Sequence, residues 1–148
     1  MSKKIKAYHI IRDRIKKEIQ DAERMMANAK GVIDKAESGL NQLRLYKQEY
    51  LTTGYKNLKN PSAADLINYQ GFLLNIDRAV DKQDEALVTA YKNYDRLKAL
   101  WIELKSKESA METLIRIDKE KKELKMMRKE QKEMDEFSSR IFFNKKYS

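Results

Sequence analysis

The 148-residue sequence predicts an all-α fold, a long two-helix antiparallel coiled-coil hairpin with a C-terminal helical overhang. Three observations support this prediction. Apolar residues recur at alternating steps of three and four along most of the chain, which is the coiled-coil spacing. The chain contains 4 Gly and 1 Pro, too few for the turns that a sheet protein requires. Because the single Pro interrupts the repeat once, we expect two helices joined by one turn, in a single coiled-coil domain over residues 1–148.

The first helix is expected over about residues 3–57. Its apolar repeat consists of two interleaved series. One series is Ile15, Ala22, Ala29, Ala36, Leu43 and Tyr50, and the other is Ile19, Met26, Ile33 and Leu40. Three successive alanines in one series let a second helix approach closely, because the distance between helices depends on the side chains at their contact. We therefore expect a close antiparallel pairing.

The turn is expected at residues 58–61. Pro61 lacks a backbone donor, and its ring disfavours helix in the residue before it. Ser62 is a good N-cap, and Asp65 places a carboxylate near the positive end of the next helix. The second helix is therefore expected over about residues 62–141. Its seam comprises Tyr69, Leu73, Ile76, Val80, Gln83, Leu87, Ala90, Tyr94, Leu97, Trp101, Leu104, Glu108, Met111 and Ile115.

The second helix is expected to be longer than the first. If the turn is centred between Lys59 and Asn60, facing residues have numbers that sum to about 119, so Met1 would face Asp118. The helix from Lys119 onward would then extend about 45 Å beyond its partner, at about 1.5 Å per residue. Its thin apolar stripe consists of Leu124, Met127 and Met134. We expect this overhang to bind a partner, since a charged single helix is marginal alone; a frayed, solvated tail is the alternative.

The two flanks of the predicted seam differ in polarity. In an antiparallel pair the g positions of both helices share one flank and the e positions share the other. The e flank is charged. The g flank is apolar and comprises Met25, Val32, Gly39, Tyr46, Phe72, Ala79, Ala86 and Leu100. Tyr46 and Phe72 are expected to face each other near the turn. Such a strip predicts a contact surface for another protein; a wider seam or a self-association face are the alternatives.

The formal net charge of +9 lies in the two termini. Residues 1–18 contain seven basic and two acidic side chains, residues 119–148 contain ten and six, and the residues between contain fifteen of each. A nucleic-acid groove would instead run along the body with interleaved aromatic residues. We therefore expect an acidic protein surface as the partner of the basic ends and no nucleic acid; binding of nucleic acid or another polyanion is the weaker alternative.

The residue patterns of catalytic and metal sites are missing from the sequence. The chain has no Cys and 1 His, its glycines are isolated, and it contains no phosphate-binding loop. We predict that the protein is not an enzyme and has no cofactor and no metal site. It also lacks a long apolar run and a signal-peptide core. A cytoplasmic protein that reaches the membrane only through partners is therefore expected.

Three segments together resemble the FliJ family, small soluble components of the bacterial flagellar type III export apparatus. They are Ile67-Asn68-Tyr69-Gln70 with Phe72 after the turn, Tyr46 and Tyr50 around Gln48-Glu49 before it, and the late Glu133-Met134-Asp135-Glu136-Phe137. The resemblance covers nearly the full length, including the position of the turn. Injectisome stalk proteins share the architecture with less of this sequence, and they are the alternative family.

The resemblance implies a non-enzymatic protein of flagellum biogenesis, similar to the central shaft subunit of rotary ATPases. It implies that the end formed by both termini enters the hexameric ring of the export ATPase FliI and promotes ring assembly and activity. It further implies a surface that docks the cytosolic domain of the export gate FlhA, and binding of export chaperones. The protein would then be cytoplasmic and peripherally associated with the export apparatus at the inner face of the cell membrane.

The resemblance also assigns site residues by position. The gate-binding residues would be Leu43, Tyr46, Tyr50, Phe72, Ile76, Ala79 and Gln83. Two positions depart from the family pattern, because Gly39 stands where a polar side chain is common and Gln83 where a histidine can occur. The ring-binding residues are expected in the basic N-terminal turns and the overhang: Lys3, Lys4, Arg12, Lys16, Leu124, Met127, Met134, Phe137 and Arg140.

Overall fold

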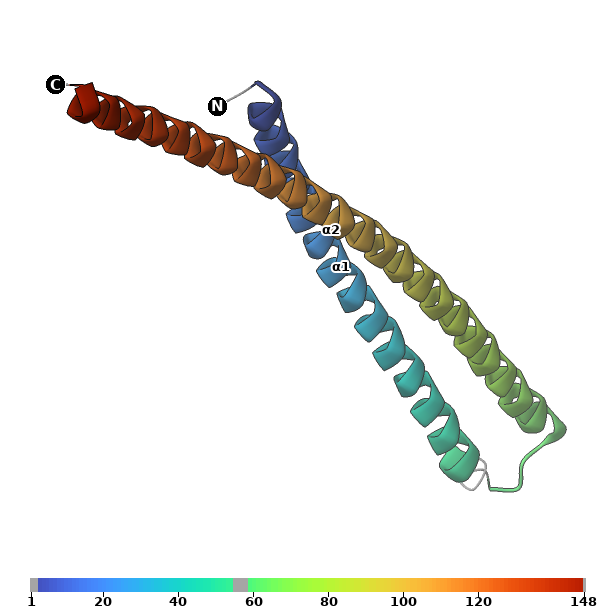
Figure 1. Cartoon of the computed structure of the whole chain (residues 1–148). Helices are drawn as coiled ribbons and strands as arrows, with labels where there is room; N and C mark the ends of the chain where they lie inside the picture. The colour runs from blue at the N-terminus through green and yellow to red at the C-terminus, as the bar shows by residue number, and fades with distance from the viewer. Residues whose placement is uncertain (1–2, 55–58, 148) are drawn as a thin grey trace. The chain divides into compact units, whose positions relative to one another are not determined.

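The computed structural model of the chain describes residues 3–54 and 59–147. These residues form α1 (Lys3–Glu49), a π-helical segment η1 (Tyr50–Gly54) and α2 (Ala63–Tyr147), with no strand among them (Figure 1). The predicted fold class, an all-α hairpin of two long helices, is confirmed. No helix within the described ranges has a stretch that is both long and apolar enough to span a bilayer.

The ends of the helices near the turn have local chemical causes. The α-helical pattern of α1 changes to the wider η1 at Tyr50, where the hydroxyl of Thr52 donates to the carbonyl of Gln48 at 3.0 Å and that of Thr53 donates to the carbonyl of Glu49 at 2.6 Å. Such side-chain bonds compete with the regular helical ladder. Residues 55–58, the end of the predicted first helix and the start of the predicted turn, lie outside the described residues.

The start of α2 is fixed by a reciprocal cap. Ser62 Oγ accepts a hydrogen bond from the Asp65 backbone N–H at 3.1 Å, and Asp65 Oδ2 accepts one from the Ser62 backbone N–H at 3.0 Å. The predicted N-cap is thus confirmed, in the geometry of a capping box. The backbone N–H and the side chain of Ser62 both hold the pKa of Asp65 below its ordinary value, because hydrogen bonds to the carboxylate favour its charged form. At the other end α2 continues to Tyr147, past the end near residue 141 that the sequence predicts.

Contacts along the helices divide the chain into two units, which we describe separately. Unit 1 comprises Met1–Ile19 and Glu103–Ser148, and unit 2 comprises Gln20–Ile102. The prediction of one domain over the whole chain stays a prediction.

In unit 2, α1 and α2 pack antiparallel along the predicted seam. Its small residues are among the most buried in the chain, with Ala22 only 2% exposed, and Ile33, Leu40, Ile76 and Leu97 are also buried. Along the charged flank, polar side chains of α1 pair with side chains of α2. As the residue number in α1 rises, the number of its partner in α2 falls, as an antiparallel arrangement requires. These pairs are Glu23 with Trp101, Glu37 with Tyr91, Arg44 with Asp84 and Lys47 with Asp77.

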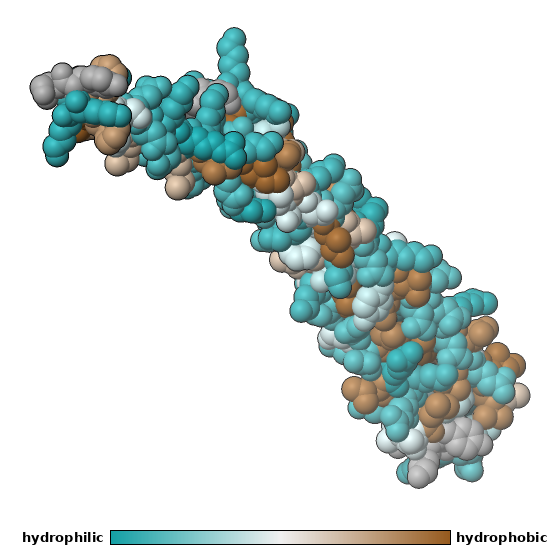
Figure 2. Space-filling view, in the orientation of Figure 1, coloured by the Kyte–Doolittle hydropathy of each residue, from teal (hydrophilic) through white to brown (hydrophobic). Residues whose placement is uncertain are grey.

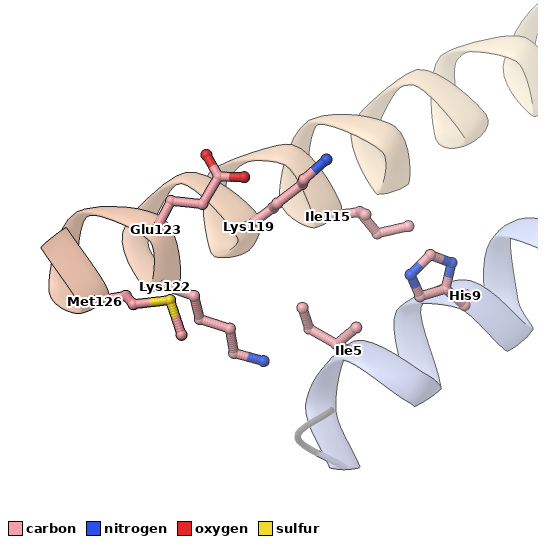
Figure 3. Close-up of a pocket in the computed structure, with 7 residues that line it drawn as sticks. All are labelled: Ile5, His9, Ile115, Lys119, Lys122, Glu123 and Met126. Atoms are coloured by element: carbon pink, nitrogen blue, oxygen red, sulfur yellow. The ribbon is translucent and has the colours of Figure 1, made fainter.

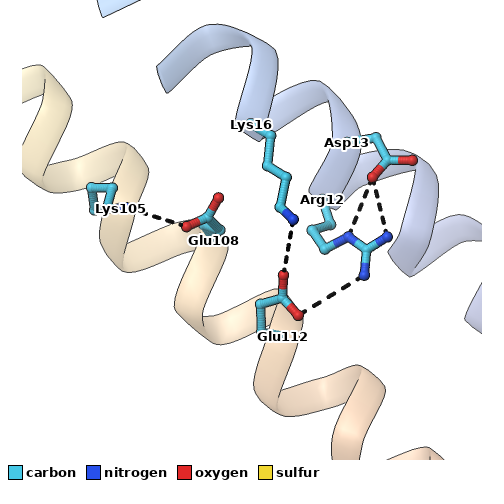
Figure 4. Close-up of polar contacts among 6 residues, drawn as sticks. All are labelled: Arg12, Asp13, Lys16, Lys105, Glu108 and Glu112. Carbon is cyan, nitrogen blue, oxygen red and sulfur yellow. Dashed lines mark hydrogen bonds and ion pairs between the residues drawn. The ribbon is translucent and has the colours of Figure 1, made fainter. Parts of the chain in front are cut away.

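In unit 1, the beginning of α1 packs on the second half of α2 through the buried residues Ile5, Ile15, Ile19 and Leu104. Glu112 of α2 lies between two cations of α1, 3.9 Å from Arg12 Nη1 and 3.6 Å from Lys16 Nζ (Figure 4). Beyond this packed part, every side chain of α2 from residue 119 to residue 146 is exposed. This last part of α2 is the predicted overhang.

Candidate functional site

An aromatic cluster lies in unit 2 where α1 ends and α2 begins. The rings of Tyr46 and Phe72 meet edge to face, with centroids 5.9 Å apart. The ring of Tyr50 lies 4.3 Å from that of Phe72 and stacks on that of Tyr69 at 4.9 Å. The prediction that Tyr46 and Phe72 face each other across the helices is therefore confirmed.

Tyr50 is the centre of this cluster, and the backbone of η1 makes room for its ring. A Cβ on Gly54 would lie 3.2 Å from a carbon of the Tyr50 ring, closer than ordinary van der Waals contact. The hydroxyl of Tyr69 donates a hydrogen bond to the carbonyl of Tyr50 at 3.3 Å. The cluster thus depends on a small residue at position 54, a feature that the sequence reasoning did not identify.

The residues assigned to the gate surface differ in exposure. The side chain of Tyr46 is 50% exposed, whereas Ile76 is only 5% exposed and belongs to the core. The other five, Leu43, Tyr50, Phe72, Ala79 and Gln83, are half-buried. Gln83 donates a hydrogen bond to the carbonyl of Ala36 at 3.1 Å. A partner can thus touch Tyr46 and the edges of its neighbours, with Ile76 supporting them from beneath.

More apolar residues surround this cluster than the heptad pattern predicts. Leu45, Leu51, Leu66, Ile67 and Leu74 are all exposed. In the space-filling view, hydrophobic patches interrupt the mainly hydrophilic surface (Figure 2). The sequence reasoning missed these residues because its seam stopped at Tyr50, resumed at Tyr69 and left outward positions unexamined. Leu66 continues the seam one heptad before Leu73, and Leu51 follows Tyr50 on the e flank. The other three are apolar residues at outward heptad positions. Exposed apolar patches of this kind are typical of protein contact surfaces.

The second candidate surface lies in unit 1 and carries the basic residues assigned to ring binding. Lys3, Lys4 and Arg140 are exposed, whereas Arg12 and Lys16 are engaged by Glu112. The four apolar residues assigned to the overhang are also exposed: Leu124, Met127, Met134 and Phe137. The sequence reasoning missed four further exposed apolar residues of this segment, Met126, Ile141, Phe142 and Phe143, partly because it ended the helix near residue 141.

A groove of about 510 Å³ separates the first turns of α1 from α2 in unit 1 (Figure 3). Ile5 and His9 line it from α1; Ile115, Lys119, Lys122, Glu123 and Met126 line it from α2. Residues past 118 therefore come close to α1, although simple pairing predicts that they have no partner. The simple pairing rule is thus wrong about which residues of α2 lie near the first turns of α1, since Met126 lines the same groove as Ile5.

These surfaces are suited to binding. Among the described residues, no three His, Cys, Asp or Glu side chains are grouped so that they could hold a metal ion. The aromatic cluster and the overhang expose large apolar side chains, and unit 1 adds the two basic segments. The arrangement can therefore engage apolar and acidic surfaces of other proteins.

Comparison with known proteins identifies relatives over nearly the whole length. The family described as "Flagellar FliJ protein" matches residues 6–147. The curated Flagellar FliJ protein of Salmonella typhi is 29% identical over 140 residues, which cover 94% of this chain and 95% of that protein. The Flagellar FliJ protein of Escherichia coli (strain K12) is also 29% identical over 140 residues, covering 91% and 92%. No solved structure matches the chain significantly.

Proposed function

We infer the function of this chain from the premise that it belongs to the flagellar FliJ protein family. It is accordingly a component of the flagellar export apparatus, and it functions in flagellum biogenesis and protein export. Its finer role is the part that we propose. The chain is a non-enzymatic, cytoplasmic stalk that engages the export ATPase FliI, the export gate FlhA and export chaperones, at the inner face of the cell membrane.

The overhang enters the FliI ring and promotes its assembly and activity. The observation that carries this proposal is the exposure of the whole last part of α2, in which Met127 and Met134 are 65% and 66% exposed. A helix with such residues and no packing partner gains most from a binding partner that covers them. Lys3, Lys4 and Arg140 supply cations for acidic loops of the ring, which would favour encounter.

The aromatic cluster contacts the cytosolic domain of FlhA. Tyr46 offers an exposed ring held by Phe72, and rigid aromatic side chains are favoured at the centres of protein interfaces. The exposed residues Leu66 and Ile67 extend this surface along the first turns of α2. Binding at this surface uses other residues than ring insertion, so the two activities should be separable by mutation.

A truncation tests the ring assignment. The chain is cut after Met126, which keeps the groove residues that lie near α1 and removes a part of α2 that is exposed through residue 146. We expect the truncated protein to lose stimulation of FliI ATPase activity, measured as phosphate release, while it still binds the cytosolic domain of FlhA in a pull-down. Circular dichroism serves as the control for folding. Full stimulation by the truncated protein would refute the assignment.

A further inference from the structure

We propose that the groove in unit 1 binds an acidic amphipathic helix of a partner protein. The groove lies between the beginning of α1 and the second half of α2 and has a volume of about 510 Å³ (Figure 3). Its apolar lining comes from Ile5, Ile115 and Met126, and the aliphatic stems of Lys119 and Lys122 add to it. The inference goes beyond insertion into the ATPase ring, because it assigns a partner to a different set of residues.

The groove has a helical wall on each side, and a helix fits between two such walls. Ile115, Lys119, Lys122 and Met126 follow one another at steps of four, three and four on α2. This is the spacing of a helix face that packs on another helix, and Ile5 and His9 repeat the step of four on α1. A third helix laid along the groove would therefore meet regular rows of side chains on both walls, as in other helix-in-groove complexes.

The groove lining and the apolar stripe of the overhang consist of different residues. Successive residues of an α-helix are rotated by about 100°, so Leu124 lies on the side of α2 that faces away from the lining. Met127 follows Glu123 by four residues, a separation at which side chains share a face, and so lies at the edge of the groove face. Occupation of the groove would consequently leave Leu124 accessible.

Charge determines the kind of helix that fits. Two lysines line the groove; Lys122 is held by Asp118 at 3.5 Å, whereas the ammonium of Lys119 makes no ion pair with any residue that the structure describes. The ammonium of Lys122 points toward Ile5 (Figure 3). The ammonium of Lys119 and the carboxylate of Glu123, the one acidic residue in the lining, both point away from Ile5 and His9, so the lining carries a net positive charge. The groove also lies between the two chain segments that carry the net positive charge.

This charge disfavours a second copy of the chain as the occupant. A copy docked through its terminal segments would bring their positive charge to the groove, and like charges across an interface are unfavourable. The chain's own remaining segment cannot fold back, because α2 is one continuous helix to Tyr147. An acidic amphipathic helix from another protein would pack its apolar side chains on the apolar lining and place its carboxylates near the lysines.

Two synthetic peptides test the proposal on the full-length chain without any ATPase. Each is a fluorescent amphipathic helix of about 20 residues, long enough to be helical, with Leu at the heptad a and d positions. One carries Glu at its flanking positions and its twin carries Lys. We expect the acidic peptide to bind at least about tenfold more tightly in fluorescence anisotropy, with an affinity that falls as salt is added. Equal binding of the twins, or binding of neither, would overturn the proposal.

Charge reversal locates the binding. The double substitution Lys119→Glu with Lys122→Glu should weaken binding of the acidic peptide by about tenfold or more. The control, Lys125→Glu with Arg128→Glu, changes the net charge equally outside the groove lining and should have a much smaller effect. Similar losses in both variants would contradict a site in the groove.

A label gives a second readout that does not depend on these variants. The chain has no cysteine, so Met126→Cys and Lys125→Cys each introduce one unique site for an environment-sensitive fluorophore. The acidic peptide should shift the emission of the label at position 126 and leave the label at position 125 nearly unchanged. An equal response at both positions would overturn the assignment.

Discussion

The side-chain amide of Gln83 lies in space that a side chain at Gly39 would need. A Cβ built on Gly39 would be 3.0 Å from Gln83 Nε2, and that nitrogen donates to the carbonyl of Ala36 at 3.1 Å. Gln83 is a polar residue in an otherwise apolar stretch of the seam, where an unsatisfied amide would be costly. Positions 39 and 83 are thus structurally linked: the glycine leaves room for the amide to reach its acceptor.

This link predicts that alanine has different effects at two helical glycines. At Gly31, whose added Cβ has nothing within 4 Å, alanine should raise the free energy of unfolding by about 0.5–1 kcal/mol, because it lowers the entropy lost by the backbone. At Gly39 alanine should raise the free energy of unfolding much less. Its Cβ would displace the amide of Gln83 and weaken the hydrogen bond from that amide to Ala36, which is worth about 0.5–1.5 kcal/mol. Urea unfolding of the two variants measures the difference.

A double-mutant cycle tests the cause. In a Gln83→Ala background the amide is gone, so Gly39→Ala should recover the stabilisation seen for Gly31→Ala. Equal stabilisation at both glycines in the unsubstituted chain would show that Gln83 moves aside without loss.

The aromatic cluster yields a prediction that separates binding from folding. Tyr46→Ala removes an exposed ring and should cost no more than about 0.5–1.5 kcal/mol of stability, the value of one aromatic pair. Phe72→Ala removes contacts to both Tyr46 and Tyr50 and should cost about 1–3 kcal/mol. Each variant should weaken binding to the cytosolic domain of FlhA by roughly tenfold, as expected of a central interface residue. Calorimetry with the purified domain gives the affinities.

The double variant is the decisive case for this surface. If Tyr46→Ala with Phe72→Ala stays helical by circular dichroism and still binds the FlhA domain with unchanged affinity and supports normal motility, the surface is not the gate contact.

Much of the fold follows from local rules that act along the sequence. The heptad spacing predicts the buried seam from Ala22 to Leu97, and the pair Ser62 and Asp65 predicts the start of α2. These features depend on residues a few positions apart. The change to η1 at Tyr50 was not predicted, because it depends on competition between threonine hydroxyls and backbone amides for the same carbonyls.

The candidate surfaces were predicted less completely than the fold. Tyr46 and Phe72 follow from the antiparallel pairing, since each lies on the same flank of the seam. Burial separates residues that the family resemblance assigns to one surface: Ile76, a seam residue, is in the core, whereas Tyr46, on the flank, is half exposed. The groove between Ile5 and Met126 was missed because the pairing rule placed every residue of α2 past Asp118 beyond the end of α1.

The cap of α2 gives a prediction for pH. The pKa of Asp65 is lowered in the folded state by its hydrogen bonds to Ser62, so this group stabilises the fold above its unfolded pKa and loses that contribution as the pH falls through the folded pKa. The Tm of the unsubstituted chain should therefore exceed that of Asp65→Asn most at neutral pH, and the difference should shrink toward the acidic end of the aspartate range. Calorimetric scans from neutral to acidic pH measure it.

The control for this prediction is Ser62→Ala, which removes the contribution of the Ser62 side chain to the lowered pKa of Asp65, keeps that of the backbone N–H and should show an intermediate pH dependence. A difference between the unsubstituted chain and Asp65→Asn that stays constant with pH would mean that the carboxylate charge does not stabilise the cap.

The overhang allows a test in which loss of function is expected without loss of stability. Met127 and Met134 are 65% and 66% exposed, so Met127→Glu and Met134→Glu should each change the free energy of unfolding by no more than about 0.5 kcal/mol. If these side chains are covered in the FliI ring, a carboxylate there would be buried without a partner, and stimulation of ATPase activity should fall by roughly tenfold.

Ser139→Glu adds the same charge to the same segment on a different side of α2 and should leave stimulation nearly unchanged. Equal stimulation by all three variants would show that the stripe does not contact the ring, whereas equal losses would point to the net charge of the overhang as the determinant.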